Sequence, residues 1–342
     1  MKLLFVGLGS IGQRHLSNLR SIYDKDDFEV LAYRCSCHNK LIRDGQAKEC
    51  PSLSEHYGFQ PFHDLDKALD VHPDAVFITN PSSLHIPVAL KAARRGCHLF
   101  IEKPLSDSME GVEELSRICS NGNLTVMVGY QTRFHPCLRL IRGFLSQPEY
   151  GRIRTAHFTW ATYLPGHHPY EDYRRGYAAR HDLGGGVVLG LSHELDLIIS
   201  LWGQARHVTA RGGHWSDLEM DVEDTVEVKM RFQDLEGEFP VKLDLTYAGR
   251  EEVRFFTIER AQARLECDLN QNSVNIRRPD GTTVFEKSFP DLRRNDLFLA
   301  EIREFLNAVH VPRQPLVSLQ EGIESLNLAL RIKEAIGEEC PR

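Results

Sequence analysis

Three glycines near the start of the chain restrict its fold more than any other feature. A short apolar run, LLFV, is followed by Gly7, Gly9 and Gly12 at the spacing G-x-G-x-x-G. Apolar residues then recur at helical spacing from Ile11 onward, with Ser10 as the expected helix cap. In such a strand–turn–helix unit the first glycine makes the turn, the second lets the backbone approach a pyrophosphate, and the third lets the helix pack closely. A glycine-rich turn without a ligand is the alternative, but the flanking strand and helix favour a dinucleotide site.

Length and charge limit the class of protein. A chain of 342 residues is expected to form about two domains. Its apolar content of 42% is ordinary for a globular protein. The formal net charge of -7, without a long basic stripe, argues against a nucleic-acid-binding surface. No apolar segment of the sequence is long enough to span a bilayer, so we expect a cytoplasmic protein without membrane contact.

The eight cysteines are scattered and match neither zinc-site nor disulfide spacing. Cys35-Ser36-Cys37-His38 brings metal-binding side chains together, yet reduced thiols near a loop are the expected state of such residues in the cytosol. His167-His168 has no third ligand nearby in the sequence. We therefore expect no metal site.

The end of the second predicted strand, at 28–33, bears on the choice of cofactor. In dinucleotide folds an acid at this point binds the ribose hydroxyls of NAD, whereas an arginine nearby can hold the extra phosphate of NADP. The strand ends in Ala32-Tyr33-Arg34 and has no acid. Because a guanidinium matches phosphate geometry, Arg34 favours NADP over NAD. A solvated loop arginine is the alternative.

Strands and helices alternate through the first 130 residues. Strands are predicted at 75–79, 98–101 and 124–129, and helices at 39–49, 62–69, 85–95 and 107–121. This alternation predicts a parallel sheet, whose ligands bind at the carboxyl ends of the strands. Thr79-Asn80-Pro81 and Glu102-Lys103-Pro104 would then lie at the same edge as the glycine turn. Lys103 would be placed to bind a substrate hydroxyl and stabilise a developing alkoxide.

Two later segments carry further chemistry. The stretch 164–182 combines aromatic rings, acids and arginines, which could bind hydroxyls and an anionic group; a charged surface loop with local ion pairs is the alternative. Gly184-Gly185-Gly186 precedes a predicted helix that contains His193. A histidine can exchange a proton with a substrate hydroxyl near neutral pH, or it can merely satisfy hydrogen bonds in a buried helix. The residues alone leave both readings open.

The rest of the chain predicts a second domain. Strand-like runs lie at 153–163, 206–213, 222–232, 237–247, 253–259, 263–268 and 273–277, and amphipathic helices at 136–146, 295–309 and 319–336. Because few helices separate these strands, we expect an antiparallel sheet.

Five segments, in this order, resemble the Gfo/Idh/MocA family of NAD(P)-dependent oxidoreductases. They are GLGSIGQRH at the start, TNPSSLH at 79–85, EKP at 102–104, GYQTRFHP at 129–136 and GGGVVLGLSHELD at 184–196. The resemblance covers nearly the whole chain. It implies an α/β protein with a Rossmann domain, assigned to 1–125, and an α/β domain with a large, open, mainly antiparallel sheet, assigned to 126–342. It also implies that the last helix packs back on the first domain, and that the open sheet supports a homodimer or homotetramer.

The resemblance further implies roles for individual residues. Lys103 and His193 would be catalytic, and the Lys103–Pro104 bond would be cis. Together with the glycine motif, it assigns cofactor contacts to Gly7, Gly9, Ser10, Ile11, Gly12, Arg34, Thr79, Asn80, Pro81, His85, Glu102 and Lys103. Substrate contacts would come from Tyr130, Arg133, Asp172, Tyr173, Arg174 and Arg180. The sequence departs from the family at Gly190, where many members have an aspartate. Asp182, Glu194 or Asp172 would have to replace it, or the histidine would act alone.

These expectations favour an enzyme that uses NADP or NAD to transfer hydride to or from a secondary hydroxyl or ketone of a sugar, nucleotide sugar or polyol. One alternative is an enzyme that oxidises a sugar transiently, eliminates a substituent and reduces the product again, with tightly bound NAD. Another is a non-catalytic dinucleotide sensor that regulates a partner. The missing aspartate is the argument for the sensor, and the retained Lys103 and His193 are the argument against it.

Overall fold

Six parallel strands form the sheet of the N-terminal domain. The computed structural model describes residues 1–34, 39–43 and 45–339, and the Cys35–His38 segment considered above as a metal site lies outside them. The sheet order is β5-β2-β1-β6-β7-β8. The strands are β1 (Lys2–Val6), β2 (Glu29–Tyr33), β5 (Gln60–Phe62), β6 (Ala75–Ile78), β7 (His98–Glu102) and β8 (Val126–Gly129). This is the doubly wound arrangement that the alternating pattern predicts.

Helices cover both faces of this sheet, and for that reason its central strands β1, β6, β7 and β8 are mainly apolar and buried. Leu4 of β1 faces a core shared with α4 (His85–Ala93) and α5 (Val112–Asn121). Leu3 and Phe5 face the opposite core, shared with α1 (Ser10–Ile22) and α9 (Arg294–His310). β8 pairs with β7, so the strand that begins at Val126 belongs to this sheet.

Three local predictions in this domain are corrected by the structure. The helix expected at 39–49 is wrong: β3 (Lys40–Arg43) and β4 (Gln46–Glu49) form a hairpin instead, and Gly45 adopts the positive φ of 72° that suits a hairpin turn. The helix expected at 62–69 is only α3 (Leu65–Leu69), because β5 pairs with β2 and the Asp64 side chain caps the helix. α5 begins at Val112, and α2 (Leu53–Tyr57) lies in a stretch that the sequence left unassigned.

An eight-stranded sheet dominates the second domain. Its order is β10-β11-β12-β9-β13-β14-β15-β16, and every pair is antiparallel except β12 with β9. The strands are β9 (Ile153–Tyr163), β10 (His207–Gly213), β11 (Thr225–Asp234), β12 (Gly237–Thr246), β13 (Ala248–Arg260), β14 (Arg264–Asp268), β15 (Ser273–Arg277) and β16 (Thr283–Ser288). The predicted antiparallel sheet is therefore confirmed. β16 was not predicted, because this edge strand is exposed along its length and has no buried face to create a pattern.

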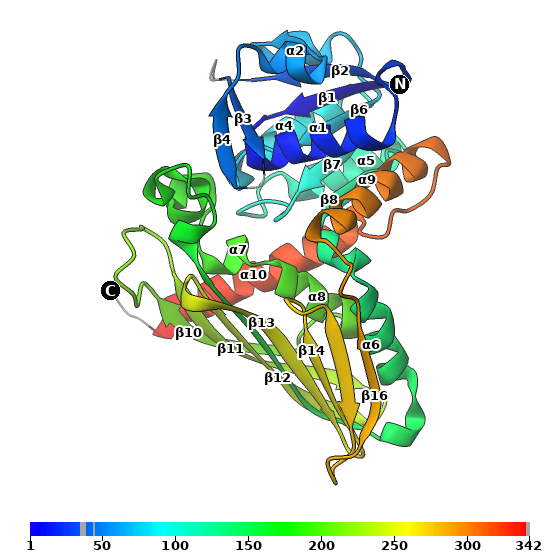
Figure 1. The fold of residues 1–342 in the computed structure, drawn as a ribbon, viewed down its shortest axis with the longest axis vertical. Helices are drawn as coiled ribbons and strands as arrows, with labels where there is room; N and C mark the ends of the chain where they lie inside the picture. The colour runs from blue at the N-terminus through cyan, green and yellow to red at the C-terminus, as the bar shows by residue number, and fades with distance from the viewer. Residues whose placement is uncertain (35–38, 44, 340–342) are drawn as a thin grey trace.

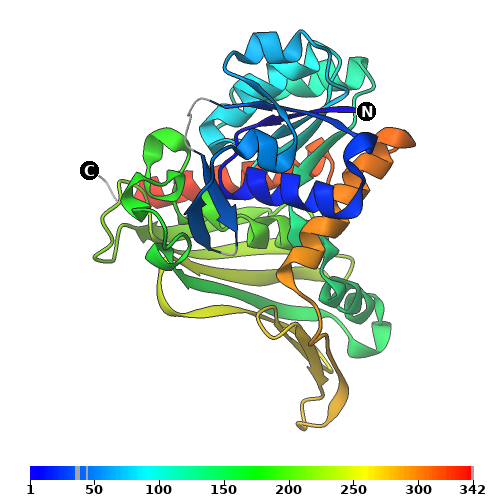
Figure 2. The ribbon, with the colours of Figure 1, turned by 45° about the horizontal axis from the view of Figure 1, so that its top comes forward.

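One face of the large sheet packs on helices, and two later helices tie the domains together. α6 (Pro136–Ser146), α7 (Val187–Gly190) and α8 (His193–Trp202) cover this face. α10 (Leu319–Glu339) lies between the two sheets (Figure 1), and the residue before it, Ser318, pairs with Met127 of β8. α9 also returns to the first domain and packs on α1 (Figure 2). The expected return of the last helix is thus observed, and α9 makes a second one.

In the part of the chain that the structure describes, no single helix is both long and apolar enough to cross a membrane; one bent pair, 181–190 with 193–202, reaches that length and composition only when joined across a 53° bend.

Candidate active site

The glycine turn has the geometry that its spacing predicts. Gly7 has a φ of 91°, which favours glycine. A Cβ on Gly12 would lie 2.3 Å from the carbonyl oxygen of Gly7, so only glycine permits this approach of α1 to the turn. A Cβ on Gly9 would meet nothing within 4 Å, which leaves open space in front of the turn. Thr79 braces the turn because its hydroxyl donates to the Gly7 carbonyl at 2.7 Å.

The start of α1 fits a dinucleotide phosphate. The sequence predicts Ser10 as the helix cap, but Ser10 is the first residue of α1. The cap position is Gly9, and no side chain caps the helix. The first backbone N–H groups of α1 are therefore not satisfied by a cap and carry the positive end of the helix dipole. Beside the turn, the buried Asn80 Oδ1 has no hydrogen-bond partner. An uncapped helix start, open space at Gly9 and an unsatisfied acceptor are what a bound dinucleotide would complete.

His85 lies behind this edge and does not point at the open space. Both of its ring nitrogens contact backbone carbonyl oxygens, Nε2 that of Asn80 at 2.8 Å and Nδ1 that of Pro104 at 2.9 Å. The side chain is buried, and burial lowers its pKa. The expected cofactor contact by His85 is therefore corrected: it joins the two loops that form the edge.

Glu102 has a similar positioning role. Its carboxylate contacts His15 Nε2 at 2.6 Å through Oε1 and accepts from the backbone N–H of Lys103 at 3.1 Å through Oε2. Both carboxylate oxygens are thus engaged within the protein, and this corrects its assignment as a cofactor contact. His15, counted in the sequence only as part of the α1 pattern, fixes the start of the Glu102-Lys103-Pro104 segment. The peptide bond between Lys103 and Pro104 is cis, as expected.

Glu301 of α9 adds a second acid to this pair. It is fully buried, and neither carboxyl oxygen has a hydrogen-bond partner. His15, Glu102 and Glu301 each have one side-chain atom of a kind that can bind a metal ion, and these three atoms lie within 4.8 Å of one another. Burial, together with the neighbouring Glu102, raises the pKa of Glu301 well above its ordinary value and so favours its neutral, protonated form.

Lys103 and His193 converge on one side of the large sheet. The Lys103 ammonium donates to the carbonyl oxygen of Gly190 at 2.8 Å. His193 begins α8, is 3% exposed, and packs edge-on against Tyr130 with the ring centres 5.6 Å apart. Burial lowers the pKa of His193 well below 6.5, and Lys103 lowers it further. His193 is therefore neutral at pH 7, the state in which imidazole can accept a proton.

Tyr247 fills the space beside Gly190, where the family resemblance predicts an aspartate. A Cβ on Gly190 would lie 1.6 Å from the Tyr247 hydroxyl oxygen, so any larger residue at 190 requires the tyrosine to move. Tyr247 is buried, and its hydroxyl donates to the Gly186 carbonyl at 3.4 Å. None of Asp182, Glu194 and Asp172 takes that space. A tyrosine from the end of β12 does, and the sequence analysis did not single it out.

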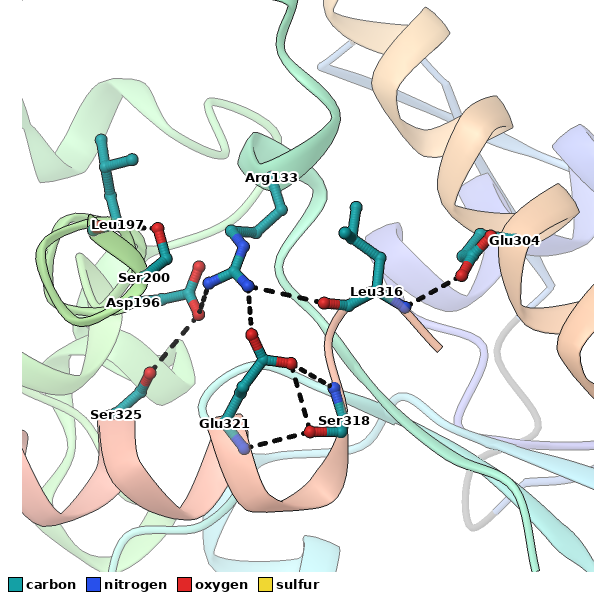
Figure 3. Close-up of polar contacts among 9 residues, drawn as sticks. All are labelled: Arg133, Asp196, Leu197, Ser200, Glu304, Leu316, Ser318, Glu321 and Ser325. Atoms are coloured by element: carbon teal, nitrogen blue, oxygen red, sulfur yellow. Dashed lines mark hydrogen bonds and ion pairs between the residues drawn. The ribbon is translucent and has the colours of Figure 1, made fainter. Parts of the chain in front are cut away.

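Arg133 and Tyr130 were predicted to contact substrate, and the structure gives them structural roles instead. Arg133 pairs with Asp196 at 3.3 Å and with Glu321 at shorter range, and it donates to the Leu316 carbonyl at 3.4 Å (Figure 3). This buried network joins the segment after β8 to α8 and the start of α10. Tyr130 is fully buried behind His193. Neither side chain reaches the open side of the site.

The charged loop at 164–182 pairs its ions locally. Arg174 contacts Asp172 at 2.8 Å and Glu219 at 3.0 Å, and Arg180 contacts Asp182 at 2.6 Å. The Tyr173 hydroxyl accepts from the Glu219 backbone N–H at 3.0 Å. Each of these four residues thus has a partner within the loop or at Glu219, and their contacts with substrate stay predictions.

Other residues of the same loop do face the site. His167 hydrogen-bonds Thr162 at 2.8 Å and packs edge-on against Tyr247 at 5.9 Å. Burial lowers its pKa to about 4, with smaller effects from His168 and Lys103. Tyr170 hydrogen-bonds His168 at 3.0 Å and interacts with Ser10 at the start of α1. The loop thus extends from the second domain to the glycine turn.

Arg254 and Trp160 complete the floor of the site, and the sequence analysis missed both. The Arg254 guanidinium lies 4.1 Å from the centre of the Trp160 ring and contacts Glu194 at 2.6 Å and Thr132 at 3.1 Å. Trp160 in turn lies 6.1 Å from the His193 ring. The sequence could not reveal this group, because its members come from four separate elements.

Comparison with known proteins identifies the family of both domains. Residues 1–130 match the oxidoreductase family with an NAD-binding Rossmann fold, and residues 138–257 match the C-terminal domain of the same Gfo/Idh/MocA family. The UDP-N-acetylglucosamine 3-dehydrogenase of Acidithiobacillus ferrooxidans is 25% identical over 334 residues, which cover 96% of each chain. The myo-inositol 2-dehydrogenase of Thermotoga maritima is 24% identical and covers 99% of this chain and 97% of its own.

A solved structure shows the same fold at lower identity. The WlbA dehydrogenase of Bordetella pertussis, in complex with NADH and UDP-GlcNAcA, has a TM-score of 0.78 and 20% identity over 99% of this chain and 97% of that one. Both domains, in the same order and over nearly the full length, are therefore shared with these proteins. The chain belongs to the Gfo/Idh/MocA family of oxidoreductases.

Proposed function

We propose that this oxidoreductase transfers hydride between a nicotinamide dinucleotide and a secondary hydroxyl or ketone of a sugar, nucleotide sugar or polyol. The observation that carries the proposal is the placement of a buried, neutral His193 and of Lys103 beside the edge that holds the glycine turn. The relatives named as sugar and inositol dehydrogenases support this substrate class.

The roles of the residues follow from their environment. The dinucleotide, when bound, supplies the hydride chemistry. The Lys103 ammonium, now held by the Gly190 carbonyl, donates to the substrate oxygen and stabilises negative charge that develops on it. His193 takes the hydroxyl proton during oxidation and returns it during reduction. Trp160 and Tyr130 hold the imidazole in place.

The cofactor site has a cation at its nucleoside end. Arg34 follows β2, and its guanidinium lies 3.4 Å from the Asn39 side-chain oxygen. We propose that Arg34 binds the 2′-phosphate of NADP, which makes NADP the preferred cofactor.

The first test is a fluorescence titration with NADPH and NADH, followed by a turnover screen against sugars and polyols. Lys103→Ala and His193→Ala are each expected to lower kcat about 10²- to 10⁴-fold while cofactor binding persists. Lys242→Ala and His207→Ala, both on exposed strand positions, are matched controls and should retain activity. Full turnover in the Lys103 and His193 variants would contradict the mechanism. Cofactor that copurifies and does not exchange would instead favour transient oxidation with elimination.

A further inference from the structure

Three arginines from distant parts of the chain meet beside the candidate active site. The guanidinium carbons of Arg14 (α1) and Arg294 (α9) lie 5.2 Å and 5.8 Å from the centre of the same ring, that of Phe298. Arg254 of β13 is fixed on Trp160 and on Glu194. Arg14 stands in the helix that follows the glycine turn, and Arg254 forms the floor beneath His193.

In the described part of the chain, Arg14 and Arg294 differ from Arg174 and Arg180 of the charged loop in having no acidic partner. Within residues 1–34, 39–43 and 45–339, neither makes an ion pair within 4.0 Å, and the one hydrogen bond of the Arg14 side chain goes to the neutral Asn295 side chain at 3.4 Å. Arg294 reaches solvent, yet burial lowers its pKa, and the charges of Arg14 and Arg254 lower it further. The Arg294 guanidinium is therefore accessible to solvent and at the same time close to other charged groups.

The position of Arg294 also opposes helix electrostatics. It is the first residue of a 17-residue helix, where the positive end of the dipole disfavours cations. Arg293, at the cap position, adds a second positive charge, and Asp296, which accepts from the Arg293 N–H at 2.9 Å, is the one acid of the first turn. Local rules of this kind are broken most often at functional positions, where binding of a ligand compensates for the cost.

The charges of Arg14 and Arg294 also lower the pKa values of histidines in the site and beside it. Arg294 is among the charges that lower the pKa of His193 and of His167, and Arg294 and Arg14 together lower that of His168. Glu252 and Glu102 are the carboxylates that act on Arg294 in the opposite direction. In a chain with a net charge of -7, a positive cluster at the site would steer anions toward it.

We propose that the substrate is an anionic sugar, whose carboxylate or phosphate is held by Arg294 and Arg14 while its reacting hydroxyl lies between Lys103 and His193. This inference rests on the proposed function, and it places the anion-binding arginines on α1 and α9, outside the loop at 164–182. The planar guanidinium groups match both kinds of oxyanion. Arg254 is paired with Glu194 and therefore attracts the anion only through its longer-range positive charge.

The test uses the protein saturated with whichever of NADPH and NADH binds, so that the glycine turn is already occupied. Inorganic phosphate and D-glucuronate are titrated separately, with sodium chloride at equal ionic strength and neutral D-glucose as references, and the shift in Tm is recorded. Wild type should show a saturable upward shift that sodium chloride and glucose do not produce. A larger response to phosphate assigns a phosphorylated or nucleotide-linked sugar, and a larger response to glucuronate assigns a sugar acid.

Single substitutions identify the residues responsible for the anion-dependent shift in Tm. Arg294→Ala and Arg14→Ala should each abolish the shift, and Arg294→Lys should retain part of it because the charge remains. Arg303→Ala, an exposed arginine on the same helix, is the matched control and should respond like wild type. With an anionic substrate from the turnover screen, Arg294→Ala should raise KM at least tenfold with little change in kcat.

Two results would overturn the inference. One is the lack of any anion-dependent shift in cofactor-bound wild type; the other is an equal shift in Arg294→Ala. Cofactor binding is read independently by fluorescence, so a protein that binds neither dinucleotide contradicts the proposed function itself. A protein that binds cofactor and not the anion contradicts only the anionic substrate.

Discussion

At the scale of single residues, buried groups without the usual partners shape this site. Gly190 is glycine because Tyr247 occupies the place of its side chain, and the carbonyl of Gly190 in turn holds Lys103. Glu301 is an acid enclosed without a hydrogen bond. A substitution at Gly190 and a substitution at Glu301 test these two statements.

Gly190→Ala should destabilise the protein by about 1–3 kcal/mol and lower kcat, because the new Cβ would overlap the buried Tyr247 hydroxyl and shift the carbonyl that holds Lys103. In Tyr247→Phe the nearest ring atom would lie 2.9 Å from that Cβ, so the double variant should recover part of both losses. Urea unfolding and kcat in a double-mutant cycle provide the measurement. Purely additive effects would show that the two positions are not coupled.

Glu301→Gln should become more stable relative to wild type as the pH rises from 5 to 8. The pKa of Glu301 is raised in the folded state, so above pH 4.5 the unfolded chain releases a proton that the folded chain retains. Wild-type stability therefore falls with rising pH by up to about 1.4 kcal/mol per pH unit until the folded-state pKa is reached. Glutamine removes this dependence.

Urea unfolding of wild type and of Glu301→Gln between pH 5 and 8 measures the difference in their free energies of unfolding. Glu304→Gln on the same helix is the contrast: Arg313 lowers the pKa of Glu304, so this variant should lose stability at neutral pH. A stability difference between wild type and Glu301→Gln that does not change with pH would contradict protonation of Glu301.

At the scale of elements, the ends of strands and helices decide what each segment contributes. The carboxyl ends of β1, β6 and β7 bring together the glycine turn, Asn80 and Lys103, as expected for a parallel sheet. The end of β2 places Arg34 at the same edge, beside the glycine turn. The starts of α1 and α9 place Arg14 and Arg294 on one ring.

Arg34→Ala should reduce the preference for NADPH over NADH at least tenfold, because a charge-assisted contact to the 2′-phosphate is worth about 1.5–3 kcal/mol. The measurement is the ratio of the dissociation constants for NADPH and NADH. Arg20→Ala, in the last turn of α1, where Arg20 donates to the Tyr57 carbonyl, serves as the control for loss of a positive charge. An unchanged ratio would leave the choice of cofactor to other residues.

At the scale of the whole molecule, the site lies between two domains that are tied together at several places. The chain crosses from β8 to α6 and returns through α9 and α10. The buried Arg133–Asp196–Glu321 network fixes the junction (Figure 3). Burial raises the pKa of Asp196 to about 7, while Arg133 opposes this effect. The network thus holds α8, and with it His193, at a fixed position relative to Lys103.

The sequence by itself determined the strand–turn–helix unit and the parallel and antiparallel sheets, and its resemblance to the family predicts the catalytic roles of Lys103 and His193. These features depend on spacings of a few residues, on hydrophobic periodicity, or on the order of short motifs along the chain. The hairpin at 40–49 escaped prediction because its short strands are only partly buried and carry a weak pattern.

Only the tertiary structure decided which charges are satisfied. Arg174 and Arg180 of the loop at 164–182, obvious anion-binding candidates in the sequence, pair with nearby acids, whereas the Arg14 side chain hydrogen-bonds Asn295, which is 281 residues away. Arg133, Glu102 and His85 became structural for the same reason, and Tyr247 took the place of a carboxylate at Gly190. A side chain's role depends on the partner that reaches it, and distant partners leave no local pattern in the sequence.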